Sequence, residues 1–193
     1  MFKTVALSFT IPVGAVAGYC YTVSRRDQSE KLHVTLDLDH TLLQSFRKKN
    51  MANTNNTNLR KHDFEILDED RTYLVWVRPF CVPTLWFLSK MFNVHMFTAA
   101  SKDYGEAMIE QLPKRFLKTY YVDSCHVKGS HGKDISIITK EKNILIDDQL
   151  RNRTLEQEFY HIPMYYRFMR FDFELPKLCA WLVMWQLQHD LKV

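Results

Sequence analysis

Short apolar runs alternate along the chain with longer segments whose apolar positions recur at helical spacing. Five runs have the length and the β-branched or aromatic content of strands: residues 32–36, 94–97, 119–122, 143–146 and 162–166. Three longer segments have the spacing of helices: residues 82–92, 102–112 and 175–191. Strands and helices that alternate in this way predict an α/β fold, a Rossmann-like, doubly wound parallel sheet covered on both faces.

The stretch between the first strand and the first helix has a different pattern. Residues 45–60 are polar, include the run N-T-N-N-T-N and show no hydrophobic period, so we expect a flexible excursion there. Residues 63–67 and 72–77 have the composition of strands and are separated by an acidic turn, which predicts a β-hairpin. Pro79 follows them and cannot continue a ladder. The sequence thus predicts a small β-hairpin insertion.

The N-terminus differs from both regions. Residues 4–23 contain no charged side chain, and twenty helical residues just cross a bilayer core of about 30 Å. Arg25 and Arg26 close this run. We expect a membrane helix here. A cleaved signal or a mitochondrial targeting segment is the alternative, because a small-residue triplet resembles a cleavage site and the segment lacks acidic residues. The predicted division is 1–26 as anchor or targeting segment and 27–193 as the folded domain.

Composition narrows the class of protein. A hydrophobic content of 46% and an aromatic content of 13% fit a folded chain. The balance of 26 basic against 22 acidic residues is mild, and we expect no nucleic-acid partner. Four cysteines are widely spread, without a C-x-x-C pair, which argues against a zinc site and against a disulfide scaffold.

Polar side chains that can carry chemistry follow three of the predicted strands. They are Asp37, Asp39 and Thr41 after the first strand, Thr98 after the second, and Asp147 and Asp148 after the strand at 143–146. Ligands of open α/β sheets bind beyond the carboxyl ends of the strands, so we expect these side chains to surround one site. Two carboxylates there suit a magnesium-dependent phosphoryl transfer, in which one attacks phosphorus and the other shuttles a proton.

Each of these features also has a structural interpretation that the sequence leaves open. Asp37 and Asp39 would then belong to an acidic turn after a strand. Thr98 would be the N-cap of the helix that follows it. Asp147 and Asp148 would form a strand-terminal turn, although two adjacent acids beside buried carbonyls repel each other and a cation relieves that repulsion.

Taken together, these segments resemble the haloacid dehalogenase superfamily, and within it the phosphatases of the RNA polymerase II C-terminal-domain type. The resemblance covers residues 32–166 and depends on five segments in the family's order: D-L-D-H-T-L-L, W-V-R-P-F, F-T-A-A-S-K-D-Y-G, G-S-H-G-K-D-I-S and L-I-D-D. One departure concerns the substrate. Relatives often carry an Arg-Glu pair just before the position of Cys125, where this chain has Y-V-D-S.

The resemblance implies a role for each matching residue. Asp37 would be the nucleophile that forms an aspartyl-phosphate, and Asp39 would protonate the leaving oxygen and then activate water. Thr41 would hold the loop through its hydroxyl group. Thr98 and Lys133 would bind the phosphate oxygens, the first as a hydrogen-bond donor and the second as a charge.

The resemblance also implies a Mg2+ ion. Asp37, the carbonyl group of Asp39, and Asp147 or Asp148 would hold it, with waters completing an octahedron. The cation would offset the negative charge of nucleophile and phosphate, which otherwise repel each other.

These features predict a membrane-anchored, Mg2+-dependent protein serine/threonine phosphatase. With only a small insertion over the site, the substrate is expected to be a phosphorylated protein segment. The alternative is a non-catalytic binding or structural subunit of a mitochondrial inner-membrane complex, similar to the translocase receptor of that family, with a membrane-complex partner. The composition of the N-terminus favours the mitochondrial inner membrane slightly over the endoplasmic reticulum and nuclear envelope.

Overall fold

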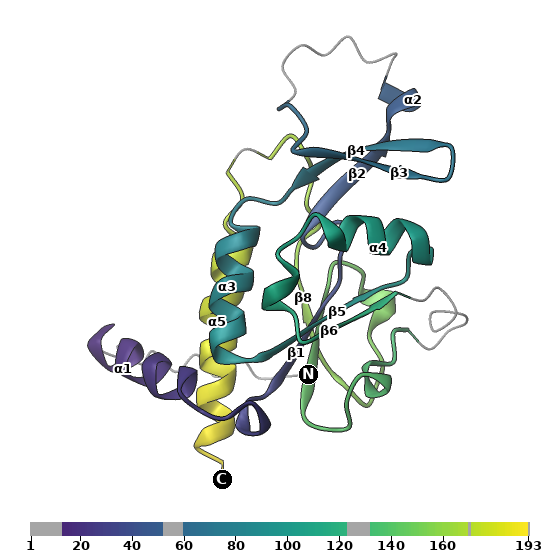
Figure 1. Cartoon of the computed structure of the whole chain (residues 1–193). Helices are drawn as coiled ribbons and strands as arrows, with labels where there is room; N and C mark the ends of the chain where they lie inside the picture. Colours follow the sequence, from purple (N-terminus) through teal and green to yellow (C-terminus); the bar gives the residue numbers. More distant parts are fainter. Residues whose placement is uncertain (1–12, 52–59, 123–131, 170, 193) are drawn as a thin grey trace.

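The computed structural model describes residues 13–51, 60–122, 132–169 and 171–192 (Figure 1). Its larger sheet has five parallel strands in the order β6-β5-β1-β7-β8. The strands are β1 (His33–Leu36), β5 (Asn93–Thr98), β6 (Thr119–Val122), β7 (Asn143–Asp147) and β8 (Glu158–His161). The predicted α/β class with a parallel sheet is confirmed.

The central strand β1 is buried on both sides, because successive side chains of a strand point to opposite faces of the sheet and both faces are covered here. On one face, Val34 and Leu36 join the main hydrophobic core together with residues of α3 (Cys81–Met91) and α5 (Glu174–Asp190). These two helices lie side by side in Figure 1. On the other face, Phe97 and Leu145 pack with Ile135. The continuous apolar runs seen in the sequence are what a doubly covered strand requires.

The insertion is a three-stranded antiparallel sheet in the order β2-β4-β3, and the prediction of a hairpin alone was incomplete. Its strands are β2 (Leu43–Arg47), β3 (Phe64–Asp68) and β4 (Arg71–Val77), and the short helix α2 (Lys48–Met51) follows β2. The start of the predicted flexible excursion was therefore wrong. Leu43 and Gln44 are buried, and Phe46 packs edge-on against Trp76 of β4. The polar run at 52–59 lies outside the described residues.

The last strand of the larger sheet was also misplaced. The sequence indicated 162–166, whereas β8 covers Glu158–His161 and pairs with β7 from Ile144 to Asp147. Ile162 and Tyr165 are fully buried, but in the irregular segment after the strand. The apolar residues at 162–166 suggested a strand because they indicate burial. The strand lies earlier in the chain, where the backbone pairs with β7.

Helix α1 (Val13–Ser24) packs at the base of the domain, against α3. Asp190, at the end of α5, accepts hydrogen bonds from Tyr19 of α1 (2.7 Å) and from Arg26 (2.7 and 3.1 Å). Within the residues that the structure describes, no helix combines the length and the apolar character needed to cross a membrane. The predicted membrane helix at 4–23 is thus not found, and residues 1–12 lie outside the description.

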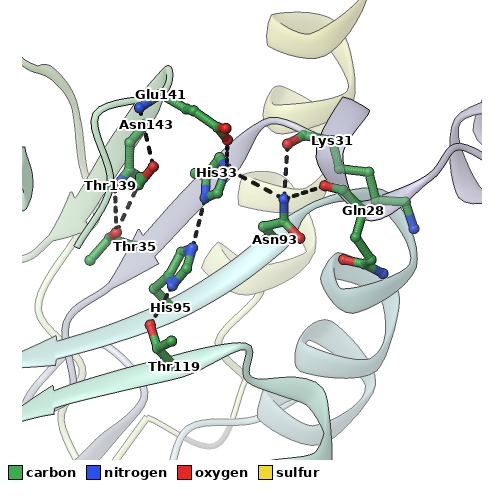
Figure 2. Close-up of polar contacts among 10 residues, drawn as sticks. All are labelled: Gln28, Lys31, His33, Thr35, Asn93, His95, Thr119, Thr139, Glu141 and Asn143. Carbon is green, nitrogen blue, oxygen red and sulfur yellow. Dashed lines mark hydrogen bonds and ion pairs between the residues drawn. The ribbon is translucent and has the colours of Figure 1, made fainter.

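A layer of polar side chains lies near the amino end of the sheet (Figure 2). His33 of β1 and His95 of β5 are joined at 2.8 Å, and His95 also bonds to Thr119 of β6 at 2.6 Å. The other ring nitrogen of His33 contacts Glu141. Asn143 of β7 exchanges hydrogen bonds with a neighbouring hydroxyl group on β1. These bonds connect the four adjacent strands β6, β5, β1 and β7, with Glu141 just before β7. They lie at the end of the sheet opposite to the predicted site.

Candidate active site

The loop after β1 carries the first group of predicted residues and is closed by backbone hydrogen bonds. The amide of Asp37 still pairs with the carbonyl of Ile146, at 2.9 Å, so this carboxylate starts from the sheet itself. The chain then turns sharply, with the amide of Leu42 bonded to the carbonyl of Leu38 (2.9 Å) and with His40 at a φ of 60°. A left-handed residue inside the turn reverses the chain within a few positions. The two carboxyl groups of this loop have different partners, Lys133 for Asp37 and Tyr104 for Asp39.

Arg78 fixes this loop from outside. Its fully buried guanidinium group donates to the carbonyl of Thr41 (3.0 Å), to the carbonyl of Pro163 (2.9 Å) and to the carboxylate of Asp172 (3.0 Å). Three acceptors around one planar cation give the geometry to which arginine is suited. The sequence analysis interpreted the Arg-Pro pair as the end of a strand and as a family motif. It did not predict that the Arg78 side chain would hold the loop in place.

Lys133 is the centre of the site. Its ammonium group is 2% exposed and donates to the carboxylates of Asp37 and Asp147, the latter at 2.8 Å, and to the carbonyl of Phe97 at 3.2 Å. Burial disfavours its charged form, but the two carboxylates outweigh this effect and raise the pKa of Lys133. The lysine thus links residues from β1, β5 and β7.

Gly132 makes this position of the lysine possible. Its φ is +69°, and a Cβ atom there would lie 2.6 Å from the carbonyl oxygen of Asn152. The amide of Lys133 donates to the same carbonyl, at 3.0 Å. Only glycine allows both the left-handed backbone and this close approach. The glycine is visible in the sequence, but its contact with the backbone of Asn152 could not be predicted from it.

The two acids at the end of β7 differ in their hydrogen bonding. Asp147 is fully buried and accepts from Lys133, from the Asn152 side chain (2.9 Å) and from the amide of Gln149 (2.7 Å). Asp148 is also buried, yet neither of its carboxylate oxygens has a hydrogen-bond partner in the described part of the chain. Oxygen atoms of Asp37, Asp147 and Asp148 lie within 4.8 Å of one another.

These three carboxylates fit a hard divalent cation. Such ions bind oxygen ligands, and an unpaired buried carboxylate is costly unless it coordinates or is neutralised. Burial raises the pKa of Asp37 to about 8, against the attraction of Lys133 and with the help of the charge on Asp147. Burial and the charge on Asp147 likewise raise the pKa of Asp148. A cation between them would favour the ionised forms.

The remaining predicted residues lie around this cluster. The Thr41 hydroxyl group is 3.4 Å from the second oxygen of Asp37. Thr98 ends β5, directly after the carbonyl that binds Lys133, and its hydroxyl oxygen accepts from the amide of Ala100 at 3.2 Å. The N-cap of the following helix α4 (Lys102–Glu110) is Ser101, not Thr98. Among the described residues no hydrogen bond uses the hydroxyl proton of Thr98, so this proton could be donated to a ligand.

Asp39 points to a different neighbour from Asp37. Tyr104 of α4 donates to its Oδ1 atom at 2.7 Å. Burial raises the pKa of Asp39. Sequence reasoning missed Tyr104, although the residue lies inside the segment F-T-A-A-S-K-D-Y-G.

The loop after the central strand β1 carries two carboxyl groups, and a buried lysine and the acidic pair at the end of β7 lie beside it. This arrangement resembles that of the haloacid dehalogenase superfamily. The chain belongs to the NLI interacting factor-like phosphatase family, whose model matches residues 32–191. The resemblance drawn from the motifs is thereby confirmed.

Two relatives illustrate the match. Nuclear envelope morphology protein 1 of Saccharomyces cerevisiae is 31% identical over 116 residues, which cover 56% of this chain and 26% of that protein. CTD phosphatase-like protein 355R of Invertebrate iridescent virus 6 is 35% identical over 79 residues, or 41% of this chain and 43% of that protein. The chain spans less than half the length of these relatives.

Solved structures support the fold. The structure of Fcp1, an essential RNA polymerase II CTD phosphatase, matches with a TM-score of 0.57 and 14% identity, over 90% of this chain and 53% of that chain. At this identity the likeness concerns the fold alone.

The predicted mitochondrial location is wrong. The relatives include a nuclear envelope morphology protein, and neither of the two relatives described above points to a mitochondrion. The prediction relied on the composition of the N-terminus, which signals of several compartments share.

Proposed function

We propose that this protein is a Mg2+-dependent phosphatase that works through an aspartyl-phosphate on Asp37. The observation that carries the proposal is the cluster of three buried carboxylates around one lysine, in which Asp148 alone lacks hydrogen bonds among the described residues. A purely structural cluster would be expected to satisfy each acid, as it does Asp147. An unsatisfied carboxylate beside a nucleophile is what a site for a cation and a phosphate requires.

In the first step, a carboxylate oxygen of Asp37 forms a bond to phosphorus while the bond from phosphorus to the ester oxygen breaks. Asp39 gives its proton to the departing oxygen, which leaves as an alcohol. Lys133 and the Thr98 hydroxyl group hold the transferring phosphoryl oxygens. The bound Mg2+ would supply positive charge that offsets the carboxylates and the phosphate.

In the second step, water attacks the phosphorus atom and gives a proton to Asp39. The bond between phosphorus and Asp37 breaks, inorganic phosphate leaves, and both carboxyl groups return to their starting states. Asp39 must therefore reach first the leaving oxygen and then the water, which occupy the same side of the phosphorus atom in turn. Its separation from the Lys133 cluster fits a group that exchanges protons and does not bind phosphate.

The proposed substrate is a phosphorylated serine or threonine in a protein. Between Thr41 and Arg78 the described residues form the small sheet β2-β4-β3 and the short helix α2, which supports an accessible site. The relatives include a CTD phosphatase-like protein and a nuclear envelope morphology protein, and we therefore propose that the activity occurs at the nuclear envelope or endoplasmic reticulum.

The test is hydrolysis of an aryl phosphate and of a phosphoserine peptide by the full chain. We expect turnover that needs Mg2+, stops with a chelator, and falls by about 10^4-fold or more in Asp37→Asn. Asp27→Asn is the matched control, because Asp27 is exposed and forms no side-chain cap bond. Absence of turnover from folded, Mg2+-loaded wild-type protein would overturn the proposal and favour a binding subunit with the same fold.

A further inference from the structure

The hydroxyl group of Tyr104 lies against the group to which we assign proton transfer. Tyr104 is on α4, is 8% exposed, and donates to Asp39 Oδ1 at 2.7 Å. The hydroxyl group of Ser45, on β2, lies 2.6 Å from the same phenol oxygen. The Tyr104 ring meets the ring of Tyr73, on β4, edge to face at 5.2 Å. Tyr104 thus connects the insertion sheet, a helix of the main domain and the loop after β1.

The direction of these hydrogen bonds follows from the available protons. A phenol has one proton. Oδ1 of Asp39 can only accept, both when the carboxyl group is ionised and when its proton is on Oδ2. The Tyr104 proton therefore goes to Asp39, and Ser45 must donate its own proton to the phenol oxygen. The result is a directed chain from Ser45 through Tyr104 to Asp39.

This chain restricts a side chain that is otherwise poorly restrained. The terminal torsion of an aspartate has a broad energy minimum, so its two oxygens exchange positions easily. Within the described part of the molecule, Oδ1 of Asp39 is bonded to Tyr104 and no hydrogen bond engages Oδ2. A carboxyl group held by one oxygen presents the other in a fixed direction, and proton transfer depends strongly on that direction.

We propose that Tyr104 is a positioning residue for the phosphatase reaction, which fixes the orientation of the Asp39 carboxyl group while Ser45 orients the phenol. The inference depends on the proposed function, since it assigns Tyr104 a part in the same reaction. Tyr104 does not exchange protons with the substrate. It keeps Oδ2 of Asp39 directed at the leaving oxygen.

The same structure allows a simpler role, in which the Tyr104 ring only fills space between α4 and the insertion sheet. Tyr104→Phe separates the two roles, because it keeps the ring and its packing and removes the hydroxyl group. Tyr73→Phe is the matched control. It makes the same chemical change in the neighbouring ring, whose hydroxyl group accepts only from Arg47 (3.2 Å) among the bonds described.

The experiment measures kcat/KM of the full chain on aryl phosphates with leaving groups of increasing pKa and on a phosphoserine peptide. kcat/KM reports the steps up to phosphorylation of Asp37, in which the leaving oxygen needs its proton. For Tyr104→Phe we expect a small loss on the best leaving group that grows to about 10- to 100-fold on the peptide. Ser45→Ala should give about a 2- to 10-fold loss with the same trend. Tyr73→Phe should stay within about 2-fold.

A double-mutant cycle completes the test. If Tyr104 acts through Asp39, Tyr104→Phe should have no further effect on the residual aryl-phosphate activity of Asp39→Ala. An equal loss in both backgrounds, or a loss that is the same for all leaving groups, would overturn the proposal and leave Tyr104 a packing residue. Absence of turnover from the wild type would instead reject the proposed function, so the two failures are distinguishable.

Discussion

The two ends of the parallel sheet both bury polar side chains, but with opposite electrostatics. At the amino end, the two histidines in the layer of Figure 2 can be satisfied in their neutral forms. Glu141 accepts from His33, whose second nitrogen can then accept from His95, which in turn accepts from the Thr119 hydroxyl group. One set of neutral tautomers matches every donor in this chain to an acceptor. In this layer the Asn93 Oδ1 atom is left without a partner among the described residues.

At the carboxyl end, charge replaces neutral hydrogen bonds. Two of the three carboxylates, those of Asp37 and Asp147, accept from the buried Lys133 ammonium group, and Asp148 has no hydrogen-bond partner among the described residues. The arrangement has an excess of negative charge, which burial makes costly. The comparison teaches that burial of polar groups is not itself a sign of function. The amino-end layer, whose unpaired atom is the amide oxygen of Asn93, fixes strands in register, whereas the layer with an unpaired buried carboxylate marks where a ligand binds.

Removal of the ammonium group should have the largest effect. Lys133→Met leaves Asp37 and Asp147 buried without their cation, which costs about 3–5 kcal/mol of unfolding free energy near neutral pH. Urea unfolding measures it, and activity should be lost as well. Lys140→Met, at an exposed position, is the control and should change stability by less than about 0.5 kcal/mol. If the two variants had equal free energies of unfolding, the charge of Lys133 would not stabilise the carboxyl end of the sheet.

The unpaired acid should control the response to metal. We expect Mg2+ to raise the stability of the wild type by about 2.7 kcal/mol at one hundred times its dissociation constant. Asp148→Asn should lose most of this gain while staying as stable as the wild type without metal, because it removes a carboxylate that has no partner. Thermal unfolding with and without Mg2+ measures both. Glu141→Gln, at the amino end, should keep the full metal response, and a loss there would remove the distinction between the two ends.

The backbone beneath Lys133 should be less sensitive. Gly132→Ala places a Cβ atom 2.6 Å from the carbonyl oxygen of Asn152 at a φ of +69°, and we expect a loss of about 1–3 kcal/mol with reduced activity. Gly18→Ala is the matched control, since a Cβ there meets nothing within 4 Å and lies inside α1. It should stabilise the helix by up to about 1 kcal/mol. If Gly132→Ala is as stable and as active as this control, the close approach of Gly132 to the Asn152 carbonyl group is not required for the fold or the site.

The smallest effect concerns pH, and the two ends should respond in opposite directions. Burial, with the nearby charges of His33 and Lys118, lowers the pKa of His95 to about 4. The unfolded chain therefore takes up this proton first, and stability is lost as the pH falls from about 6.5 towards 4. In His95→Gln, the unfolding free energy should fall less over this pH range than in the wild type, by on the order of 1–2 kcal/mol. Denaturant unfolding at several pH values measures the difference. Parallel pH curves for variant and wild type would contradict the assignment.

Asp37 should behave in the reverse sense. Its pKa is raised by burial to about 8, so in metal-free protein its contribution to stability is present below about 4 and is lost as the pH rises through 8. Asp37→Asn should flatten the stability curve between these limits, measured in the presence of a chelator. A steeper curve in the variant would mean that Lys133, and not burial, dominates this carboxylate.

Local pattern was enough to place most of the main domain. The apolar run ending at Asp37 and the one ending at Asp147 are strands β1 and β7, and the helix expected at 82–92 is α3 at Cys81–Met91. Hydrophobic periodicity reports burial over neighbouring positions, so it is reliable where an element is covered by its own domain. It failed at β2 and β8. Their identity as strands depends on pairing with β4 and β7, which no short window of sequence contains.

The sequence by itself determined which reactive groups the protein has and at which strand ends they occur, because parallel strands bring their carboxyl ends to one edge. It did not determine how these groups are paired. Lys133 meets Asp37 from 96 positions away, and Tyr104 meets Asp39 from 65 positions away. Only the tertiary structure decided that Asp147 would be satisfied and Asp148 left open, because hydrogen bonds and charge compensation act between atoms close in space and not between neighbours in the chain.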